Sequence, residues 1–409
     1  MTMHTSTKTF SLVIICSILL VYNATAQITS SPYSIFGIGT VEENSIGENK
    51  AMGGTGIALL SKRSLNFLNP ASYDGLDSLV TIFEIGFFGK YTSFSTSKKS
   101  QALFDANIKY AAMGFRIAPR WATSFGITSY STIGYKINVP SPVEGSLLTY
   151  NKTFSGEGGV NQFYFGNSYR ITRNIIFGIN AAYLFGTIKH SESSETFNYS
   201  FQNVTYLSNF NLNYGLNYQF LNDRWKYNIG LIYSNGKTLT TKNVSTVITG
   251  NETEIIKSHS NKFRIPKTVG IGLAFGKDFF RGGVDYEIKT WKDIDFANTL
   301  LETRNSDRFS LGIEFPSTGI RRGSNRMIFY RFGAEYNGSY LIVDNIPINY
   351  RAISFGAGIP VKGILSVINV SLELGQNGSE KKGLFKENFC TLHLDLSLKE
   401  LWFMKRKYD

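Results

Sequence analysis

Every second residue is large and apolar in many segments of this 409-residue chain, and this pattern restricts its fold more than any other feature. In the stretch NFNLNYGLNYQF, residues 209–220, one set begins Phe210, Leu212, Tyr214, while the other holds only amides and a glycine. Because successive side chains of a strand point to opposite faces, a period of two predicts strands with one apolar face. A soluble β-sandwich would bury that face in a core, whereas a transmembrane barrel would turn it toward lipid.

Fourteen segments carry the alternation, an even number as in closed bacterial barrels. They are predicted at residues 79–94, 103–117, 121–137, 157–171, 174–190, 205–220, 226–242, 266–276, 281–292, 307–316, 325–337, 350–360, 364–376 and 388–399. Their connections alternate between short turns and long loops, with residues 317–325 as the one poor fit. Short turns at one rim and long loops at the other are typical of outer-membrane barrels. The sequence therefore predicts an all-β fold, a transmembrane antiparallel β-barrel over residues 78–400.

The charged residues of these strands constrain which face is inside. A Lys or Arg that faces lipid at the bilayer midplane costs about 2–4 kcal/mol, so charged strand residues are expected in the lumen. This predicted lumen charge network contains Glu84, Asp285, Glu287, Lys289 and Glu335, with Arg331 close by. Tryptophan positions suggest aromatic belts, with Trp121, Trp225 and Trp402 expected at one rim and Trp291 at the other.

The N-terminus of the chain indicates export. Residues 1–26 read as a signal peptide, with Lys8, an apolar run over 10–22 and the small-x-small site that ends at Ala26. Cleavage near Ala26 would send the protein toward the outer membrane of a Gram-negative bacterium. Residues 401–409 are predicted to form a basic tail. The net charge of +12 comes from scattered basic residues, which suits anionic lipid head groups better than nucleic acid.

Residues 27–77 do not alternate and are rich in glycine and small polar residues, so they form either a flexible tail or a plug. Apolar members such as Ile35, Phe36 and Phe67 favour a packed plug. The segment AMGGTGIAL, followed by Asn69-Pro70-Ala71, resembles the N-terminal hatch of FadL-type long-chain fatty-acid transporters. The residues that carry the motif are Gly53, Gly54, Gly56, Asn69, Pro70 and Ala71.

Two later segments, IPKTVGIGLAFG running into VDYEIKTWKD and then YRFGAEYN, resemble the same family. The general character of the chain is that of members found in Bacteroidota. The resemblance implies a fourteen-stranded barrel plugged by the hatch, with passive uptake of hydrophobic molecules. The family also contains barrels that act as secretion partners, so the fold alone does not decide the function. The chain departs from the family at its end, where KRKYD follows residues 402–404 in place of a closing aromatic residue.

The sequence gives little support for an enzyme, a cofactor or a metal site. His190, His259 and His393 are distant in sequence and have no metal-ligand spacing, and Cys390 has no neighbouring histidine. Asp285 and Glu287 share a face and could form an acid/base pair, but pairing with Lys289 or Arg331 is the simpler interpretation.

The residues considered for ligand contact are Arg331, whose guanidinium could grip a carboxylate, Phe88 with Lys90, and Ile57 with Leu59 in the hatch. The alternatives are an ion pair of Arg331 with Glu335 or Asp285, and wall packing for the apolar residues. Two functions follow: passive uptake of small hydrophobic or amphipathic, fatty-acid-like molecules, or a structural, secretion or assembly role beside another envelope protein.

Overall fold

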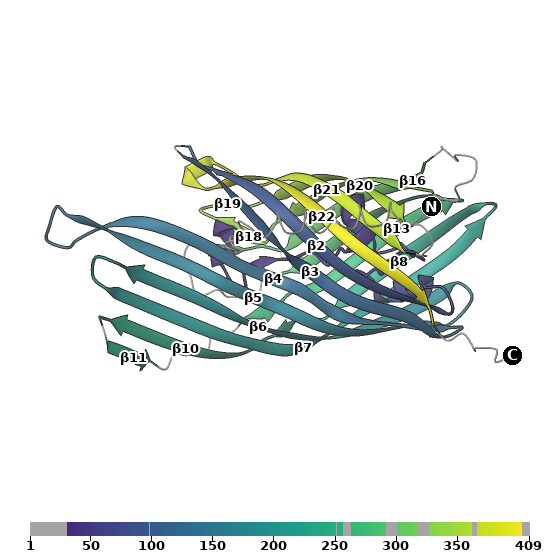
Figure 1. Ribbon diagram of the computed structural model, residues 1–409, viewed down its shortest axis with the longest axis horizontal. Helices are drawn as coiled ribbons and strands as arrows, with labels where there is room; N and C mark the ends of the chain where they lie inside the picture. Colours follow the sequence, from purple (N-terminus) through teal and green to yellow (C-terminus); the bar gives the residue numbers. More distant parts are fainter. Residues whose placement is uncertain are drawn as a thin grey trace, which may run out of the picture.

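The computed structural model describes residues 31–97, 99–250, 252–256, 263–291, 301–317, 327–361 and 366–402. The predicted signal peptide and residues 403–409 of the predicted tail lie outside these ranges. Within them, fourteen antiparallel strands form a closed ring, because β2 pairs with β3 on one side and with the last strand, β22, on the other (Figure 1). The predicted barrel and its strand number are confirmed.

The ring strands follow one another in chain order and pair with their neighbours in sequence. They are β2 (Val80–Ser95), β3 (Ser100–Ala118), β4 (Trp121–Pro142), β5 (Thr149–Arg170), β6 (Ile175–Ser194), β7 (Tyr199–Asn222), β8 (Trp225–Ser234), β13 (Lys267–Lys277), β14 (Phe280–Thr290), β16 (Ser306–Pro316), β17 (Phe329–Gly338), β20 (Tyr350–Pro360), β21 (Val367–Gly378) and β22 (Lys386–Leu401).

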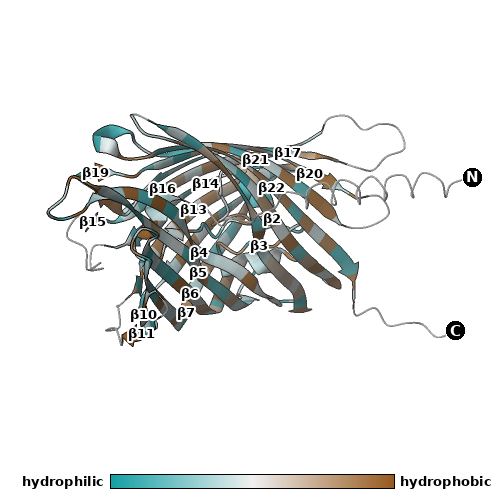
Figure 2. Ribbon diagram, turned by 60° about the vertical axis from the view of Figure 1, so that its left-hand side comes forward, coloured by the Kyte–Doolittle hydropathy of each residue, from teal (hydrophilic) through white to brown (hydrophobic). Residues whose placement is uncertain are grey.

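The apolar faces of the strands point outward. Phe210 is 61% exposed on the outer face of β7, whereas Asn217 of the same strand is fully buried inside. Figure 2 shows hydrophobic and hydrophilic residues alternating along the barrel strands. An apolar exterior around a polar interior is the arrangement of a membrane-spanning barrel. Separately, none of the helices in the described ranges has the length and apolar character needed to span a bilayer.

The barrel wall is much taller on one side. Strands β4 to β7 have 20 to 24 residues, whereas β8 has 10 and β13 has 11. The first part of β7, residues 199–208, pairs with β10 (Thr240–Thr249), which in turn pairs with β11 (Glu252–Ile256). Figure 1 shows this part of the sheet reaching beyond the other strands on the left. Smaller elements at the long-loop end are β9 (Lys237–Thr238), β12 (Arg264–Ile265), β15 (Leu301–Thr303), β18 (Leu341–Val343), β19 (Ile346–Pro347) and η4 (Lys381–Gly383).

The predicted single strand over 226–242 is wrong, because β8 ends at Ser234 and the chain turns before β10. Gly236 makes this turn with a φ of +64°, and a side-chain carbon there would lie 2.6 Å from the Lys267 backbone nitrogen. The strand ends here because glycine alone adopts this positive φ readily and alone leaves room for the neighbouring backbone.

Residues 31–77, called the hatch below, lie inside the barrel, where Figure 1 draws them in purple. They contain η1 (Pro32–Ile35), β1 (Thr40–Val41), η2 (Gly47–Met52) and η3 (Pro70–Gly75). Local sequence starts and stops these turns. The Asn69 side chain accepts a hydrogen bond from the Ala71 N–H, with Pro70 at the first helical position. Gly53 ends η2 in the left-handed region.

The tryptophan belt prediction needs one correction. Trp121 and Trp402 are 42% and 39% exposed at the short-turn rim, where they were expected. Trp291 is buried, however, and its ring stacks on Tyr340 with centroids 3.9 Å apart. Its indole N–H donates to the Ser306 hydroxyl at 3.1 Å. Trp291 therefore packs inside the long-loop end and does not face lipid.

Candidate functional site

Glycines of the wall let the hatch backbone touch the barrel directly. A side-chain carbon at Gly333 of β17 would lie 2.0 Å from the Gly53 nitrogen, and one at Gly312 of β16 would lie 2.4 Å from the Met52 carbonyl oxygen. The Gly53 N–H donates to the Ser354 hydroxyl at 2.8 Å. The glycine motif of the hatch therefore fits against glycines of the wall, with no room for a side chain between them.

Asp285 anchors the hatch through backbone amides. One carboxylate oxygen accepts the N–H groups of Gly56 and Ile57 at 2.6 and 2.8 Å. The structure thus places Asp285 against the hatch backbone, and Asp285 has no ion pair with Lys289 or Arg331 within the described ranges. Glu287 does pair with Lys289, at 2.9 Å, as the simpler interpretation predicted.

The Asn69-Pro70-Ala71 motif is fixed on the opposite wall. The Asn69 amide donates to the Ile57 carbonyl at 2.7 Å and to the Leu216 carbonyl of β7 at 3.2 Å. Gly178 and Gly215 leave the space that this motif fills, since side-chain carbons there would lie about 2 Å from hatch atoms. The motif residues therefore have a docking role in this structure.

Five charged residues join the hatch to the wall and are called the hatch clamp: Glu48, Arg63, Arg281, Glu314 and Arg331. Glu48 of the hatch lies 2.6 Å from Arg281 and 3.0 Å from Arg331, and these two arginines bind Glu314 at 2.8 and 2.7 Å. Arg63 of the hatch also pairs with Glu314. Burial alone raises the pKa of the Glu48 carboxyl, but the guanidinium groups of Arg281, Arg63 and Arg331 outweigh it and hold that pKa below its usual value.

The Arg331 side chain makes its charged contacts within this clamp. Its guanidinium is fully buried and also donates to the Asn369 side chain at 2.7 Å. The partners predicted for an ion pair, Glu335 and Asp285, are not its partners here. Glu335 pairs instead with Arg308, at 2.7 Å, and Glu84 accepts from the Leu65 N–H and the Ser397 hydroxyl. The predicted lumen charges all face inward, but they form several separate contacts: Asp285 and Glu84 contact the hatch, whereas Glu287 pairs with Lys289 within the wall.

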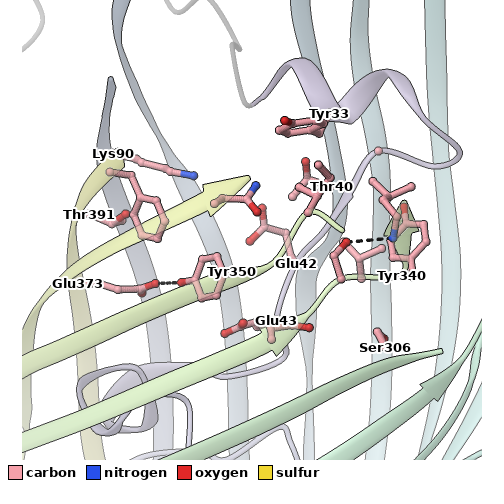
Figure 3. A pocket seen from close by; sticks show the side chains of 18 of the residues that line it. Tyr33, Thr40, Glu42, Glu43, Lys90, Ser306, Tyr340, Tyr350, Glu373 and Thr391 are labelled. Atoms are coloured by element: carbon pink, nitrogen blue, oxygen red, sulfur yellow. Dashed lines mark hydrogen bonds between the residues drawn. The ribbon is translucent and has the colours of Figure 1, made fainter. Parts of the chain in front are cut away.

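A cavity of about 220 Å³ lies above the hatch at the long-loop end and is called the outer cavity. Phe88, Phe389 and Trp291 line it. Figure 3 shows Tyr340 and Tyr350 among the rings around it, with Lys90 nearby. Ile57 and Leu59 do not line it; Ile57 packs under Gly270 and Gly272, and Leu59 packs with Met52, Ala58 and Ala274. The other lining residues that matter below are Lys50, Lys90, Lys109, Lys289, Glu42, Glu43, Glu373 and His393.

Lys90 has a different environment from the other three lysines of the outer cavity. Lys50 pairs with Glu43 at 3.0 Å, Lys109 with Glu42 at 3.5 Å, and Lys289 with Glu287 at 2.9 Å. The Lys90 ammonium instead lies 4.7 Å from the centroid of the Phe389 ring, and within the described ranges no carboxylate oxygen lies within 4 Å of it. The cavity thus combines aromatic walls with one cation, Lys90, that has no carboxylate within ion-pair distance in the described ranges, although Asp105 and Glu387 lie near enough for their charges to interact with it.

Sequence reasoning proposed Phe88 and Lys90 and missed Lys109, Glu373 and His393. The alternation that places Glu84 and Lys90 inside the barrel could also have identified His393, because His393 lies between the outward-facing Leu392 and Leu394 on β22. The short-turn end holds a second, open hollow of about 680 Å³, where Asp74 of the hatch accepts from Arg116 and Arg170. The hatch lies between the two spaces.

Comparison with known proteins identifies a matching family model and solved structures of similar fold. A family model described as BamG matches residues 7–409, and no curated protein matches the chain. The solved structures of similar fold include the toluene transporter TbuX of Ralstonia pickettii, at a TM-score of 0.59 and 14% identity over 87% of this chain and 99% of that one.

Two further structures agree with this result. The toluene transporter TodX of Pseudomonas putida gives a TM-score of 0.58 at 13% identity, covering 89% of this chain and all of that chain (100%). The monoaromatic hydrocarbon channel CymD gives 0.55 at 14% identity, covering 89% and 99%. The predicted resemblance to FadL-type barrels is therefore confirmed at the level of the fold, and the Bacteroidota branch stays a prediction.

Proposed function

This chain belongs to the BamG family, and we propose that it is an outer-membrane barrel for the passive uptake of small amphipathic molecules, which bind first in the outer cavity. The apolar exterior supports a place in the outer membrane. The solved structures of similar fold are described as toluene transporters and a monoaromatic hydrocarbon channel, which supports uptake of small hydrophobic compounds over other roles.

The observation that carries the proposal is the chemistry of the outer cavity. Its volume of about 220 Å³ lies below the range of about 300–1,000 Å³ typical for drug-sized ligands. A single aromatic ring or a short alkyl chain suits this space better than a long-chain fatty acid. Lys90 beside the Phe389 ring favours a ligand with one anionic group on an apolar body, for which benzoate is a suitable probe.

Passage would require the hatch to move. Residues 39–43 and Lys50 of the hatch line the outer cavity, so a bound molecule contacts the element that separates the two ends of the lumen. Lys50 in turn bridges Glu43 and Glu373 at 3.0 and 3.7 Å. A ligand carboxylate would compete for these cationic groups, and this competition is the step we propose to loosen the upper part of the hatch.

Replacement of Lys90 by alanine is expected to weaken benzoate binding about tenfold or more. A hydrogen bond to a charged group contributes about 1.5–3 kcal/mol, and 1.4 kcal/mol corresponds to a factor of ten. Isothermal titration calorimetry of the purified barrel measures the effect. Lys226→Ala at the short-turn end is the matched control and should bind like the wild type. Equal affinities of Lys90→Ala and wild type would reject Lys90 as the anchor.

A second candidate function is that of a structural or assembly partner without transport, and the hatch clamp is the observation that favours it. The five charged residues of the clamp, of which Glu48, Glu314 and Arg331 are buried, and the direct backbone contacts at Gly333 and Gly312 hold the hatch firmly. The tall sheet of β4 to β7 would provide a surface for a second envelope protein. Liposomes that contain the barrel separate the two functions: benzoate influx above that of empty liposomes supports uptake, whereas no influx together with a stable co-purifying envelope protein supports the partner role.

A further inference from the structure

The outer cavity has two chemically different ends. The cationic end holds Lys90 of β2 beside the Phe389 ring of β22. The apolar end consists of five residues that pack as one cluster and that all line the cavity: Tyr33, Trp291, Tyr340, Leu341 and Ile348. A molecule in this space therefore meets a positive charge at one end and a cluster of apolar side chains at the other.

The strand order of the barrel sets these two ends far apart. Trp291 directly follows β14, and between β14 and β2 the ring contains β16, β17, β20, β21 and β22. This arc is close to half of the ring, so the two ends lie on nearly opposite sides of the lumen. Figure 3 shows Lys90 and Tyr340 on opposite sides of the cavity. The outer cavity thus crosses the lumen above the hatch.

The polar groups between the two ends are engaged with one another. Lys50 pairs with Glu43 at 3.0 Å, and Glu373 accepts a hydrogen bond from the Tyr350 hydroxyl. Within the described ranges, Lys90 is the one lysine of the cavity without a carboxylate at ion-pair distance. A ligand held there by its anionic group would point its apolar body along the cavity, toward the apolar end.

Trp291 is held in place at the apolar end by four contacts. Its backbone N–H donates to the Asn305 side chain at 3.2 Å, and its carbonyl accepts from the Thr303 hydroxyl at 3.3 Å. Its indole N–H donates to Ser306, as described above, and its ring stacks on Tyr340 with an angle of 11° between the two planes. Because both the backbone and the ring are fixed, the ring cannot swing aside without losing these contacts.

We infer that Trp291 limits the length of the molecule that the outer cavity accepts, because its fixed ring closes the apolar end. This inference rests on the proposed uptake function and narrows its substrate class to anionic compounds with one ring or a short chain. An apolar pocket gains about fourfold in affinity for each further methylene group that it can bury. The position of this wall therefore decides whether an extended ligand gains affinity or loses it.

Two ligands that differ only in length test the inference: benzoate and 4-butylbenzoate, each titrated into the purified barrel by calorimetry. The wild type should bind 4-butylbenzoate no more tightly than benzoate, because the butyl chain meets the Trp291 ring. Trp291→Ala should bind 4-butylbenzoate about tenfold or more tightly than the wild type does, with little change for benzoate. Trp121→Ala, which removes an exposed tryptophan at the short-turn rim, is the matched control and should keep the wild-type preference.

Heat-modifiable migration checks that each variant forms the barrel. If Trp291→Ala does not, Trp291→Phe removes part of the ring and should still shift the preference toward 4-butylbenzoate. Variants that keep the wild-type ratio of the two affinities, or a wild type that already prefers 4-butylbenzoate about tenfold, would overturn the inference alone, because benzoate still binds. A wild type that binds neither ligand would overturn the uptake proposal and this inference with it.

Discussion

Replacement of Glu48 by glutamine is expected to release the hatch from the wall. Glu48 contacts three arginines of the hatch clamp, Arg281 at 2.6 Å, Arg331 at 3.0 Å and Arg63 at 3.6 Å. Without its charge, these guanidinium groups share Glu314 alone. Removing one member of a buried ion pair costs about 3–5 kcal/mol, because it leaves an uncompensated buried charge.

Limited trypsin digestion with mass spectrometry of the fragments measures this release at Lys50, which is buried while the hatch is docked. The Glu48→Gln hatch should be cut much faster than that of the wild type, while the barrel keeps its heat-modifiable migration. Glu157→Gln, which removes an exposed ion pair with Lys189, should change nothing, since such pairs contribute at most about 1 kcal/mol. Equal trypsin protection of Glu48→Gln and wild type would show that the clamp does not hold the hatch.

The clamp also has a defined pH dependence. The pKa of Glu48 is lower in the folded protein than in the unfolded chain, so its stabilisation is present above the ordinary pKa of a glutamate and is lost only as the pH falls through the lower, folded value. The docked hatch should therefore resist mild acid, and the wild-type advantage in protection, measured with the acid-active protease pepsin, should persist when the pH is lowered to the ordinary glutamate range.

The barrel could be predicted from the sequence because the pattern that specifies each strand lies within that strand. Each strand carries its own alternation, and lipid on one side makes a shift by one residue very unfavourable, so Phe210 and Asn217 could be assigned to opposite faces without any partner strand. The error at 226–242 arose where the apolar alternation continues past Gly236, although the backbone must turn there to pass Lys267. Trp291 was misplaced because it lies just past the end of β14, where its ring packs inward onto Tyr340.

The contacts of the hatch were not predictable in the same way. Strand phase could place Arg331 inside the lumen, but its partner Glu48 is 283 residues away and belongs to a segment with no repeating pattern. Which lumen charges meet the hatch depends on how that segment docks. The same limit applies to Asp285, whose partners are backbone amides and therefore leave no trace in residue type.

The Gly333→Val variant is expected to displace the hatch more strongly than any side-chain truncation. The first side-chain carbon at this position would lie 2.0 Å from the Gly53 nitrogen and 2.1 Å from the Met52 carbonyl carbon. Ordinary overpacking of a core costs about 1–3 kcal/mol because side chains can repack. Here the obstacle is the hatch backbone at Met52 and Gly53, which cannot rotate away as a side chain can, so we expect the loss to exceed about 3 kcal/mol.

The barrel itself should survive this change, because valine favours strands and β17 keeps its pairing with β16 and β20. The expected result is an intact barrel by heat-modifiable migration, with rapid trypsin cleavage in the hatch and faster benzoate entry into liposomes. Gly89→Val is the matched control, since a carbon there meets only the edge of the Phe104 ring at 3.3 Å. An open hatch without faster entry would move the function toward the partner role, because it would show that the hatch is not what limits passage.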